Sequence, residues 1–526
     1  MKPTRRQFLA TALAGGAATL AGCRRPEPMP GSIHGGSSAL GHRLRTGGFP
    51  APDKTEEVDT VIVGGGIAGL AAARRLTKTG ADFLLLELEP TPGGNSASGR
   101  NEVSAYPWGA HYLPLPNSEA TEITALLEEL GLITGRDSAG RAIYDDFALC
   151  SDPVDRLFTC GRWQEGLLPQ LGITADDRRQ YAEFFAYTDR QKNARGRDGR
   201  RAFAIPLDLS SRDPELLALD RFTMAEFMDQ HGWNSEPLRW FVDYSCRDDY
   251  GAGIRTVSAW AAIHYFAGRD SVSANAAPDA VLTWPEGNAW LVDKIAAPLR
   301  SRIRSRCLAW KIEAAGTHTF VEYFDASSKR SIRIKARAVI CATPRFIAQR
   351  LVRDLPSVPL DYSPWMVANL TLDSLPTGTG AALAWDNVAR DSPSLGYIVA
   401  THQSLRSVPR RTVLTHYWPL DRDPPKVARE KALARTHASW CEEIITDLER
   451  IHRGITDHVR QIDIWLWGHG MIRPVPGFLW GETRAQLAKP HGSIFFAHSD
   501  LSGISIFEEA YTRGVQAADA VRQHLG

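Results

Sequence analysis

The feature that most constrains the fold is a glycine-rich turn between an expected strand and an expected helix. Residues 59–63 are β-branched and apolar, as in a buried strand, and residues 67–76 are good helix formers. Gly64, Gly66 and Gly69 follow the strand with the spacing G-x-G-x-x-G. In such a turn the first glycine permits the bend and the second lets the backbone approach a pyrophosphate. The third lets helix and strand pack closely.

A second expected strand, residues 83–87, completes a strand–helix–strand unit around this turn. The helix N-terminus presents unpaired N–H groups and the positive end of its dipole to a phosphate. Glu87 stands near the offset of about 20 residues at which a carboxylate binds a ribose hydroxyl. The alternative for Glu87 is a solvated carboxylate at a strand end. The unit predicts an adenine dinucleotide site formed by Gly64, Gly66, Ile67, Ala68, Gly69 and Glu87.

Length and composition are those of a large globular protein. The chain has 526 residues, enough for more than one domain. Hydrophobic residues make up 43% and charged residues 23% of it, and the formal net charge is +1. Nucleic-acid binding favours a clearly basic domain or stripe, so we expect no nucleic-acid partner.

The first residues are typical of an export signal rather than of a folded domain. Arg5 and Arg6 precede an apolar run of roughly 15 residues, shorter than the about 20 that a membrane-spanning helix needs. The arginine pair resembles a twin-arginine signal, whose route carries folded cargo. Residues 20–23 resemble a lipobox, in which Cys23 is cleaved before and acylated; the alternative is an ordinary signal with Cys23 incidental. We therefore expect a periplasmic, lipid-anchored protein. Arg24 after the cysteine favours the outer over the inner membrane in a Gram-negative host.

The remaining cysteines form no C-x-x-C pair, so they indicate neither a metal site nor a disulfide framework. Cys150 and Cys160 either pair after export or remain two buried thiols.

Beyond the signal, residues 24–57 are rich in Pro, Gly, Ser and charge, which predicts a flexible tether. Further helices are expected at 121–130, 214–231, 426–450 and about 508–523, and strands at 331–341 and 493–497. Residues 190–201 form a basic loop, either solvated or acting as a lid or membrane contact.

Five further segments carry a family resemblance. They are the double glycine of residues 92–95, residues 108–112, the turn at 284–291, the Ala-Thr-Pro of residues 342–344, and residues 495–518. Together with the glycine turn they resemble the flavin-containing amine oxidase superfamily, which includes monoamine and polyamine oxidases, phytoene desaturases and protoporphyrinogen oxidase. The resemblance implies an FAD cofactor, bound non-covalently because no Ser-Gly-Gly-Cys stretch lies near the C-terminus.

The resemblance also implies the fold class and its division. The implied fold class is α/β (α+β). One domain is a Rossmann-like FAD-binding domain of the glutathione-reductase type, built from discontinuous segments, and the other is an inserted substrate domain of mixed sheet and helices. We expect FAD-binding segments at 58–112, 281–350 and 461–526, and substrate-domain segments at 113–280 and 351–460, after the signal at 1–23 and the linker at 24–57. Implied cofactor-binding residues, besides those of the first unit, are Gly93, Gly94, Asn95, Gly109, Ala110, His111, Asp500, Ile506 and Phe507.

The chain departs from the family pattern at several positions. Asn95 stands where the family has an arginine that reaches FAD, and Arg100 either compensates or lies on the surface. The family's lysine near the flavin is missing: no lysine lies between Lys335 and Lys426, and Arg350 falls near the expected place. Because arginine stays protonated, it cannot relay a proton.

No catalytic residue can be assigned, and the weak candidates are His469, Trp467, His498 and Arg350. The segment that contains Trp467 and His469 resembles the desaturase branch; the alternative is core aromatics in a capped loop. For His498 the alternative is a hydrogen-bonded structural histidine. Residues 244–251 place aromatics beside carboxylates, which either hold a cationic amine or form an ion-pair cluster with Arg247.

The sequence thus predicts an FAD-dependent oxidoreductase that transfers hydride from a small-molecule substrate, with O2 or a quinone as electron acceptor. The favoured reaction is the oxidation of an amine, and the alternative reaction is the desaturation of an apolar C–C bond. A third hypothesis is a protein that binds flavin without catalysing a reaction. The only membrane contact expected is the N-terminal lipid anchor.

Overall fold

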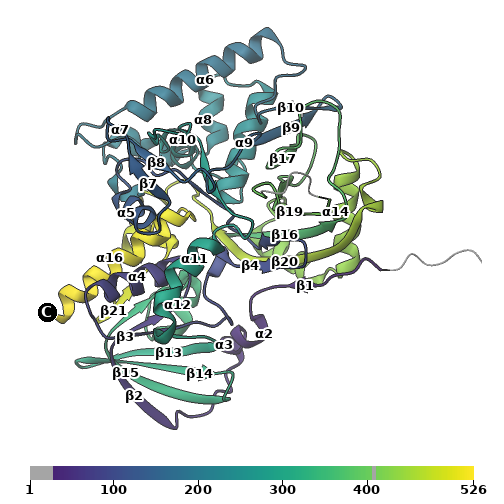
Figure 1. Cartoon of the computed structure of the whole chain (residues 1–526). Coiled ribbons are helices and arrows are strands. Elements are labelled where there is room, and N and C mark those ends of the chain that lie inside the picture. The colour runs from purple at the N-terminus through teal and green to yellow at the C-terminus, as the bar shows by residue number, and fades with distance from the viewer. Residues whose placement is uncertain (1–27, 405–409) are drawn as a thin grey trace, which may run out of the picture.

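The computed structural model describes residues 28–404 and 410–526. The expected signal and lipobox therefore lie outside the described residues. Figure 1 shows a lower body, which contains both a sheet and the C-terminal helix, below a second sheet and a group of helices.

The lower body is a Rossmann-like layer. Its seven-stranded sheet has the order β12-β3-β2-β15-β14-β13, with β21 beside β15. The strands are β2 Lys54–Val63, β3 Phe83–Leu86, β12 Ile303–Arg304, β13 Cys307–Ala315, β14 His318–Asp325, β15 Arg330–Cys341 and β21 Ile494–Phe496. β2 pairs in parallel with β3 and β15, and β15 with β21.

Two helices far apart in the sequence pack together over this sheet. They are α4 (Ile67–Lys78) and α16 (Phe507–Leu525), and a Cβ at Gly514 would lie 2.1 Å from the Ala68 carbonyl oxygen. A side chain at 514 would therefore force the helices apart. Segments from near the N-terminus, the middle and the C-terminus thus build one layer, and the predicted α/β class with a Rossmann-like domain is confirmed.

The second sheet has eight strands in the order β1-β20-β16-β19-β18-β17-β9-β10. They are β1 Ile33–His34, β9 Asp155–Thr159, β10 Arg162–Glu165, β16 Tyr362–Leu372, β17 Asp386–Ala389, β18 Tyr397–Val399, β19 Thr412–Pro419 and β20 Val459–Ile472. Every residue of β16 is buried, because it lies between β20 and β19 and both its faces are covered.

The remaining elements cover the sheets and connect them. The helices are α5 Thr121–Glu129, α6 Ala175–Asn193, α7 Pro214–Leu217, α8 Met224–Gln230, α9 Glu236–Tyr250, α10 Ala259–Ala267, α11 Ala289–Ala296, α12 Arg345–Leu351, α13 Pro425–Ala434, α14 His437–Glu449 and α15 Glu482–Leu487. The short strands are β4 Ser98–Arg100, β5 Ala105–Pro107, β6 Tyr112–Pro114, β7 Ile133–Arg136, β8 Ala142–Tyr144 and β11 Val281–Thr283.

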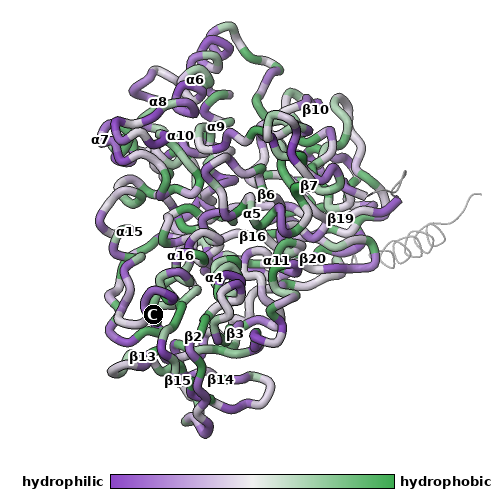
Figure 2. The backbone as a smooth tube through the Cα atoms, turned by 60° about the vertical axis from the view of Figure 1, so that its left-hand side comes forward, coloured by the Kyte–Doolittle hydropathy of each residue, from purple (hydrophilic) through white to green (hydrophobic). Residues whose placement is uncertain are grey.

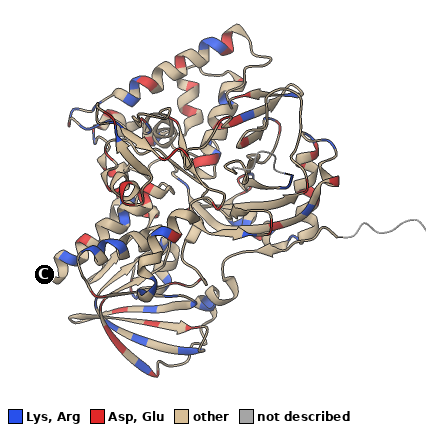
Figure 3. Cartoon of the chain, viewed as in Figure 1, with Lys and Arg blue, Asp and Glu red and all other residues tan. Residues whose placement is uncertain are grey.

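Hydropathy and charge follow this arrangement. Figure 2 shows hydrophilic stretches concentrated on the outer elements, such as α6. In Figure 3 positive and negative residues alternate along α6 rather than forming a field of one sign. Among the described residues, no helix is both long enough and apolar enough to cross a membrane.

Two expected helices are each broken by a new N-cap. The expected helix 214–231 is divided into α7 and α8, because Thr223 and Glu226 form a capping box that starts α8. The expected helix 426–450 is divided into α13 and α14, because the Thr436 side chain accepts the Ser439 N–H and starts α14. A capping side chain favours a helix start even within a periodic stretch.

The expected flexible tether is wrong for its described part. β1 pairs in parallel with β20, and α2 (Ser38–Gly41), α3 (Arg43–Thr46) and the first residues of β2 follow it. The Ser37 N–H and hydroxyl both donate to the Glu89 carboxylate, at 2.6 and 2.8 Å. These polar residues are held by backbone pairing and side-chain hydrogen bonds. Because such contacts need no regular spacing of hydrophobic residues, the sequence did not indicate them.

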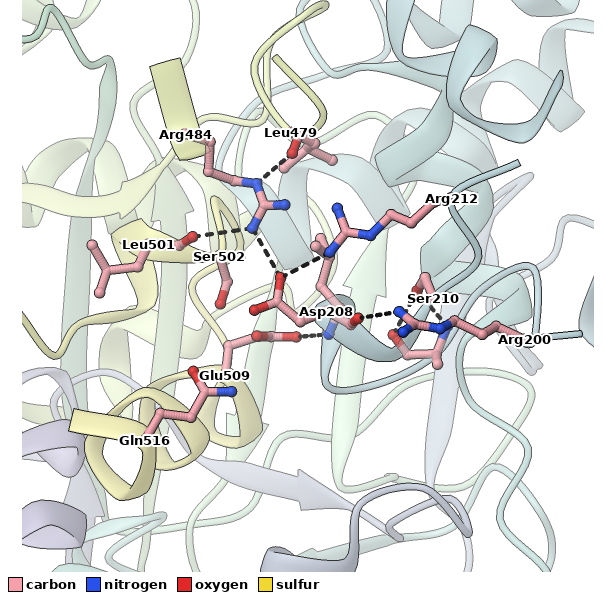
Figure 4. Close-up of polar contacts among 12 residues, drawn as sticks. Arg200, Asp208, Ser210, Arg212, Leu479, Arg484, Leu501, Ser502, Glu509 and Gln516 are labelled. Atoms are coloured by element: carbon pink, nitrogen blue, oxygen red, sulfur yellow. Dashed lines mark hydrogen bonds and ion pairs between the residues drawn. The ribbon is translucent and has the colours of Figure 1, made fainter. Parts of the chain in front are cut away.

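A cluster of arginines joins residues 207–212, which follow the basic loop, to the C-terminal helix (Figure 4). The Asp208 carboxylate lies 2.7 Å from Arg513, 3.3 Å from Arg484 and 3.6 Å from Arg212. Glu509 of α16 accepts the backbone N–H of Leu207 beside it. Residues 207–212 are therefore held against α16, the helix that begins at the site described next.

The two cysteines considered for a disulfide are free, and Cys160 is exposed rather than buried.

Candidate cofactor and substrate site

A cavity of about 440 Å³ lies at the carboxyl ends of β2 and β3. The glycine turn, the loop after β21 and the segment before β2 all contribute to its wall. Ligands of open α/β sheets bind at this edge of the strands. Predicted cofactor residues that line it are Gly64, Gly66, Ile67, Ala68, Glu87, Gly93, Gly94, Asn95, Ala110, Asp500, Ile506 and Phe507.

The glycine turn has the geometry that its spacing predicts. Gly64 has φ 106°, and a Cβ there would lie 2.7 Å from the Ala342 carbonyl oxygen. A Cβ at Gly69 would lie 1.9 Å from the Gly64 carbonyl oxygen, and Gly69 packs the turn without lining the cavity. A Cβ at Gly66 would meet nothing within 4 Å. Gly66 is the N-cap of α4 and supplies no side-chain hydrogen bond, so the first N–H groups of α4 are left for a ligand.

Glu87 is buried at the rim of this turn. Its carboxylate accepts the N–H of Gly65 at 2.6 Å and of Glu89 at 2.7 Å. Burial raises the pKa of Glu87 to about 7, against the effect of these hydrogen bonds. The alternative of a solvated strand-end carboxylate is therefore wrong, and its contact with a ribose hydroxyl stays a prediction.

The double glycine runs beside the same turn. Gly93 donates its N–H to the Gly65 carbonyl at 2.9 Å, and Gly93 and Gly94 have φ of 144° and 56°. The Asn95 side chain donates to the Gly470 carbonyl at 2.6 Å and so ties this loop to β20. Arg100 lies on β4 and is exposed, outside the cavity lining, so it does not replace the missing arginine.

The loop after β21 closes the far side. Asp500 accepts the Arg345 N–H at 2.8 Å and the Tyr362 hydroxyl, and the His498 Nδ1 lies 3.0 Å from its other oxygen. Burial opposes ionisation, but His498 and these hydrogen bonds lower the pKa of Asp500. A buried carboxylate thus fixes the loop from which Ile506 and Phe507 reach the cavity.

A second cavity of about 150 Å³ adjoins the first. The two share Asn95, Ala110, Gly470, Ser505, Ile506 and Phe507 in their walls. Aromatic side chains form much of the smaller cavity: His111, Tyr112, Trp365, Tyr417 and Trp467.

These rings are held in place by contacts with each other and with the backbone. His111 stacks on Tyr417 with centroids 4.4 Å apart, and the Tyr417 hydroxyl donates to the Gly109 carbonyl at 2.9 Å. The Trp467 indole donates to the Trp108 carbonyl at 2.6 Å. Burial lowers the pKa of His111 to about 4, so this ring is neutral at physiological pH.

The charged end of the smaller cavity has more carboxylates than cations. Arg269 lies 3.1 Å from Glu508 and 3.9 Å from Asp249. Among the residues that the structure describes, the Asp248 side chain has one hydrogen-bond partner, the Tyr112 hydroxyl at 3.4 Å. Burial and then the charge of Asp249 raise the pKa of Asp248 to about 7. The ion-pair cluster expected with Arg247 is wrong, because Arg247 pairs with Asp421 at 2.8 Å.

The four weak catalytic candidates divide between the cavities. His469, His498 and Arg350 line the larger one, and Trp467 lines the smaller one together with Gly109 and His111. His469 stacks on Phe346 at 4.2 Å, and burial, Arg429 and Arg45 lower its pKa to about 4. Within the described residues, no lysine lines either cavity.

Sequence reasoning missed several lining residues. The segment predicted to be a tether contributes Gly41, His42, Leu44 and Arg45. Other elements contribute Trp365, Tyr417 and Arg269, and the sequence did not predict which of their side chains line the cavity. The only available signal was the aromatic–acidic stretch that includes Asp248.

Comparisons with known proteins agree with this geometry. Residues 62–130 match a family described as an NAD(P)-binding Rossmann-like domain. Flavin-containing amine oxidase A of Sus scrofa is 28% identical over 186 residues, 35% of this chain and 30% of that protein. Flavin-containing amine oxidase B of Cavia porcellus is 41% identical over 80 residues, 15% of each chain. The matched segments thus span less than a third of these relatives.

Solved structures match over far more of the chain. Putrescine oxidase bound to putrescine has a TM-score of 0.65 at 15% identity, covering 89% of this chain and 100% of that one. Cyclohexylamine oxidase from Brevibacterium oxydans IH-35A has a TM-score of 0.64 at 17% identity, with 89% and 100% covered. The chain therefore has the fold of these oxidases, and the sequence matches support the resemblance to the flavin amine oxidase superfamily.

Proposed function

We propose that this protein is an FAD-dependent oxidoreductase that dehydrogenates a cationic amine. The observation that carries the proposal is Asp248, a half-buried carboxylate that forms no ion pair with any described residue, in an aromatic-walled cavity that adjoins the dinucleotide cavity. The sequence relatives and the fold relatives are named as amine oxidases, which supports the same reaction class.

The larger cavity fits FAD. The open N-terminus of α4 and the bare Gly66 suit a diphosphate, and Glu87 stands where a ribose hydroxyl would bind. Asn95 and residues 505–507 line both cavities, so the flavin end would lie where the two cavities adjoin. FAD, when bound, supplies the hydride acceptor.

The smaller cavity supplies what an ammonium group needs. Asp248 offers the countercharge, and the rings of Tyr417 and Trp467 line the same cavity and are of the type that forms cation–π contacts. Neutral His111 adds no repulsion. Because a carboxylate without a countercharge is costly once a ligand excludes water from it, a bound cation would be favoured over an uncharged analogue.

The amine must also lose a proton before hydride leaves its carbon. A general base works best when its pKa is near the operating pH. Asp248 has a raised pKa of about 7, so its carboxylate is suited both to hold the ammonium and to accept a proton from it. This assignment does not need the lysine that the chain lacks.

The test is a substrate panel with the purified, flavin-loaded protein. Primary and secondary amines should bleach the flavin without oxygen and release peroxide in air, whereas alcohol and hydrocarbon isosteres should do neither. Bleaching by isoprenoids alone would establish a desaturase instead. If no compound bleaches the flavin although dithionite does, the protein binds flavin without turnover.

We also propose that the enzyme is exported by the twin-arginine route and anchored through Cys23, with O2 or a quinone reoxidising the flavin. The support is the motif at residues 5–9 and 20–23. Palmitate labelling that disappears in Cys23→Ser, with the wild-type protein in the outer-membrane fraction, is the expected result. Unlabelled wild-type protein would contradict the anchor.

A further inference from the structure

We propose that residues 33–46, here called the N-terminal strap, form part of the cofactor site, and that Arg45 binds the diphosphate of the dinucleotide. The inference rests on the proposed function, since it takes a dinucleotide to occupy the larger cavity. It explains how the site acquires positive charge when the position after the double glycine is Asn95.

The strap spans the cavity from one sheet to the other. At its start, Ile33 pairs with Ile464 of β20, the strand that also carries His469 and Gly470. Ser37 then bonds to Glu89, two residues beyond Glu87. Figure 1 shows α2 and α3 between the two sheets. Gly41, His42, Leu44 and Arg45 are thereby placed in the cavity wall.

Neighbouring arginines on the strap have different surroundings. The Arg43 guanidinium lies 4.5 Å from the Phe49 ring centroid and 4.3 Å from that of Phe324. Residues two apart on a helical turn point in nearly opposite directions. Arg43 therefore anchors the strap on the sheet, and Arg45 lines the cavity.

The charges that line the cavity favour an anion. Of its carboxylates, Glu87 accepts two backbone N–H groups. One oxygen of Asp500 accepts the Arg345 N–H and the Tyr362 hydroxyl, and the other lies 3.0 Å from the His498 Nδ1. Arg45 and Arg350 have no side-chain hydrogen bond or ion pair with any described residue. Two exposed arginines without a partner among the described residues thus line a cavity that also contains the open N-terminus of α4. A diphosphate, with two negative charges, matches this arrangement.

Asn95 cannot take the role of the missing arginine. Its amide donates to the Gly470 carbonyl, so it joins the double glycine to β20. The strap pairs with the same strand, and the cation comes from Arg45 instead. A segment whose sequence predicts a linker is therefore a structural part of the binding site.

The test measures cofactor affinity rather than turnover. Apoprotein prepared from the full chain is titrated with FAD, and with ADP as a competitor that has the diphosphate but no flavin. The variants are Arg45→Ala, Arg45→Lys and, as a matched control, Arg300→Ala. Arg300 is exposed and lines neither cavity.

Arg45→Ala should raise the Kd for both FAD and ADP about tenfold and make FAD binding less sensitive to salt. Arg45→Lys should recover most of the affinity, and Arg300→Ala should match the wild type. FAD should also slow amide exchange in residues 38–46. If Arg45→Ala binds both ligands like the wild type, the strap proposal is wrong while the proposed function stands. If the wild type binds no FAD, the proposed function itself fails.

Discussion

The Tyr112 hydroxyl lies 3.4 Å from the Asp248 carboxylate, and this is the one hydrogen bond that Asp248 makes through its side chain among the described residues. The nearby guanidinium of Arg269 forms ion pairs with Glu508 and Asp249 instead. The cavity therefore keeps an unmatched negative charge beside the dinucleotide site. A substrate that carries one positive charge would balance it.

Replacing this carboxylate should impair amine turnover and leave cofactor binding intact. In Asp248→Asn, kcat/KM for cationic amines should fall about 100-fold, because losing one partner of a buried charge pair costs about 2–5 kcal/mol. Steady-state peroxide release and the Kd for FAD are the measurements. Asp293→Asn, at an exposed position on α11, is the matched control and should behave as wild type. Equal kcat/KM in Asp248→Asn and wild type would exclude Asp248 as the amine partner.

The reaction should lose efficiency in acid. Burial and Asp249 raise the pKa of Asp248 to about 7, so below that pH its carboxyl becomes neutral and no longer attracts an ammonium. Simple amines stay protonated across this range, with pKa values of about 10. A profile of kcat/KM against pH should decline below about pH 7 in the wild type. Asp248→Asn should lack this decline, and an identical decline in the variant would assign it to another group.

Adding a single methyl group at position 66 should weaken cofactor binding without lowering the stability of the fold. Gly66→Ala meets no atom within 4 Å and Gly66 has φ −71°, so the apoprotein should keep its Tm. The methyl lies where a diphosphate approaches the backbone, and the Kd for FAD should rise at least about tenfold. Gly64→Ala is the contrasting variant: its Cβ would lie 2.7 Å from the Ala342 oxygen, and it should unfold at lower temperature. Normal FAD affinity in Gly66→Ala would place the dinucleotide elsewhere.

The arginine cluster of Figure 4 should stabilise the fold at neutral pH. Although burial opposes it, the arginines, Arg513 first, hold the pKa of Asp208 below its usual value. Asp208→Asn should thus lower the free energy of unfolding by about 2–4 kcal/mol at pH 7, since the arginines lose their counter-ion.

The sign of the pH effect follows from this lowered pKa. The contribution of Asp208 is complete above the pKa that an aspartate has in the unfolded chain, about 4, and is lost as pH falls through the folded value. Urea denaturation at pH 7 and at pH 3 should therefore show a smaller difference between variant and wild type in acid. A difference that stays constant with pH would mean that the carboxylate charge is not what stabilises the cluster.

Local signals in the sequence predicted the glycine turn and several other segments that line the larger cavity. The spacing of Gly64, Gly66 and Gly69 fixes a turn within a few residues, and their conformations follow from sterics alone. The double glycine and the loop near Asp500 were placed by motif, and both line the cavity. The binding roles of these residues stay predictions.

The rest of the site depends on contacts between distant parts of the chain. Arg45 lies in a polar stretch without periodicity, and its position is set by the pairing of Ile33 with Ile464. Asp248 lacks an ion-pair partner among the described residues because Arg269 pairs with Glu508, which lies 239 residues after Arg269 in the chain. No local pattern encodes such a choice of partner.

A structure of the flavin-loaded protein with an amine substrate bound in the absence of oxygen would show whether Asp248 holds the amine beside the cofactor. We expect the diphosphate at the N-terminus of α4 and the substrate nitrogen about 3 Å from an Asp248 oxygen, between Tyr417 and Trp467. An amine bound outside this cavity, or one whose nitrogen is paired with a different carboxylate, would contradict this expectation.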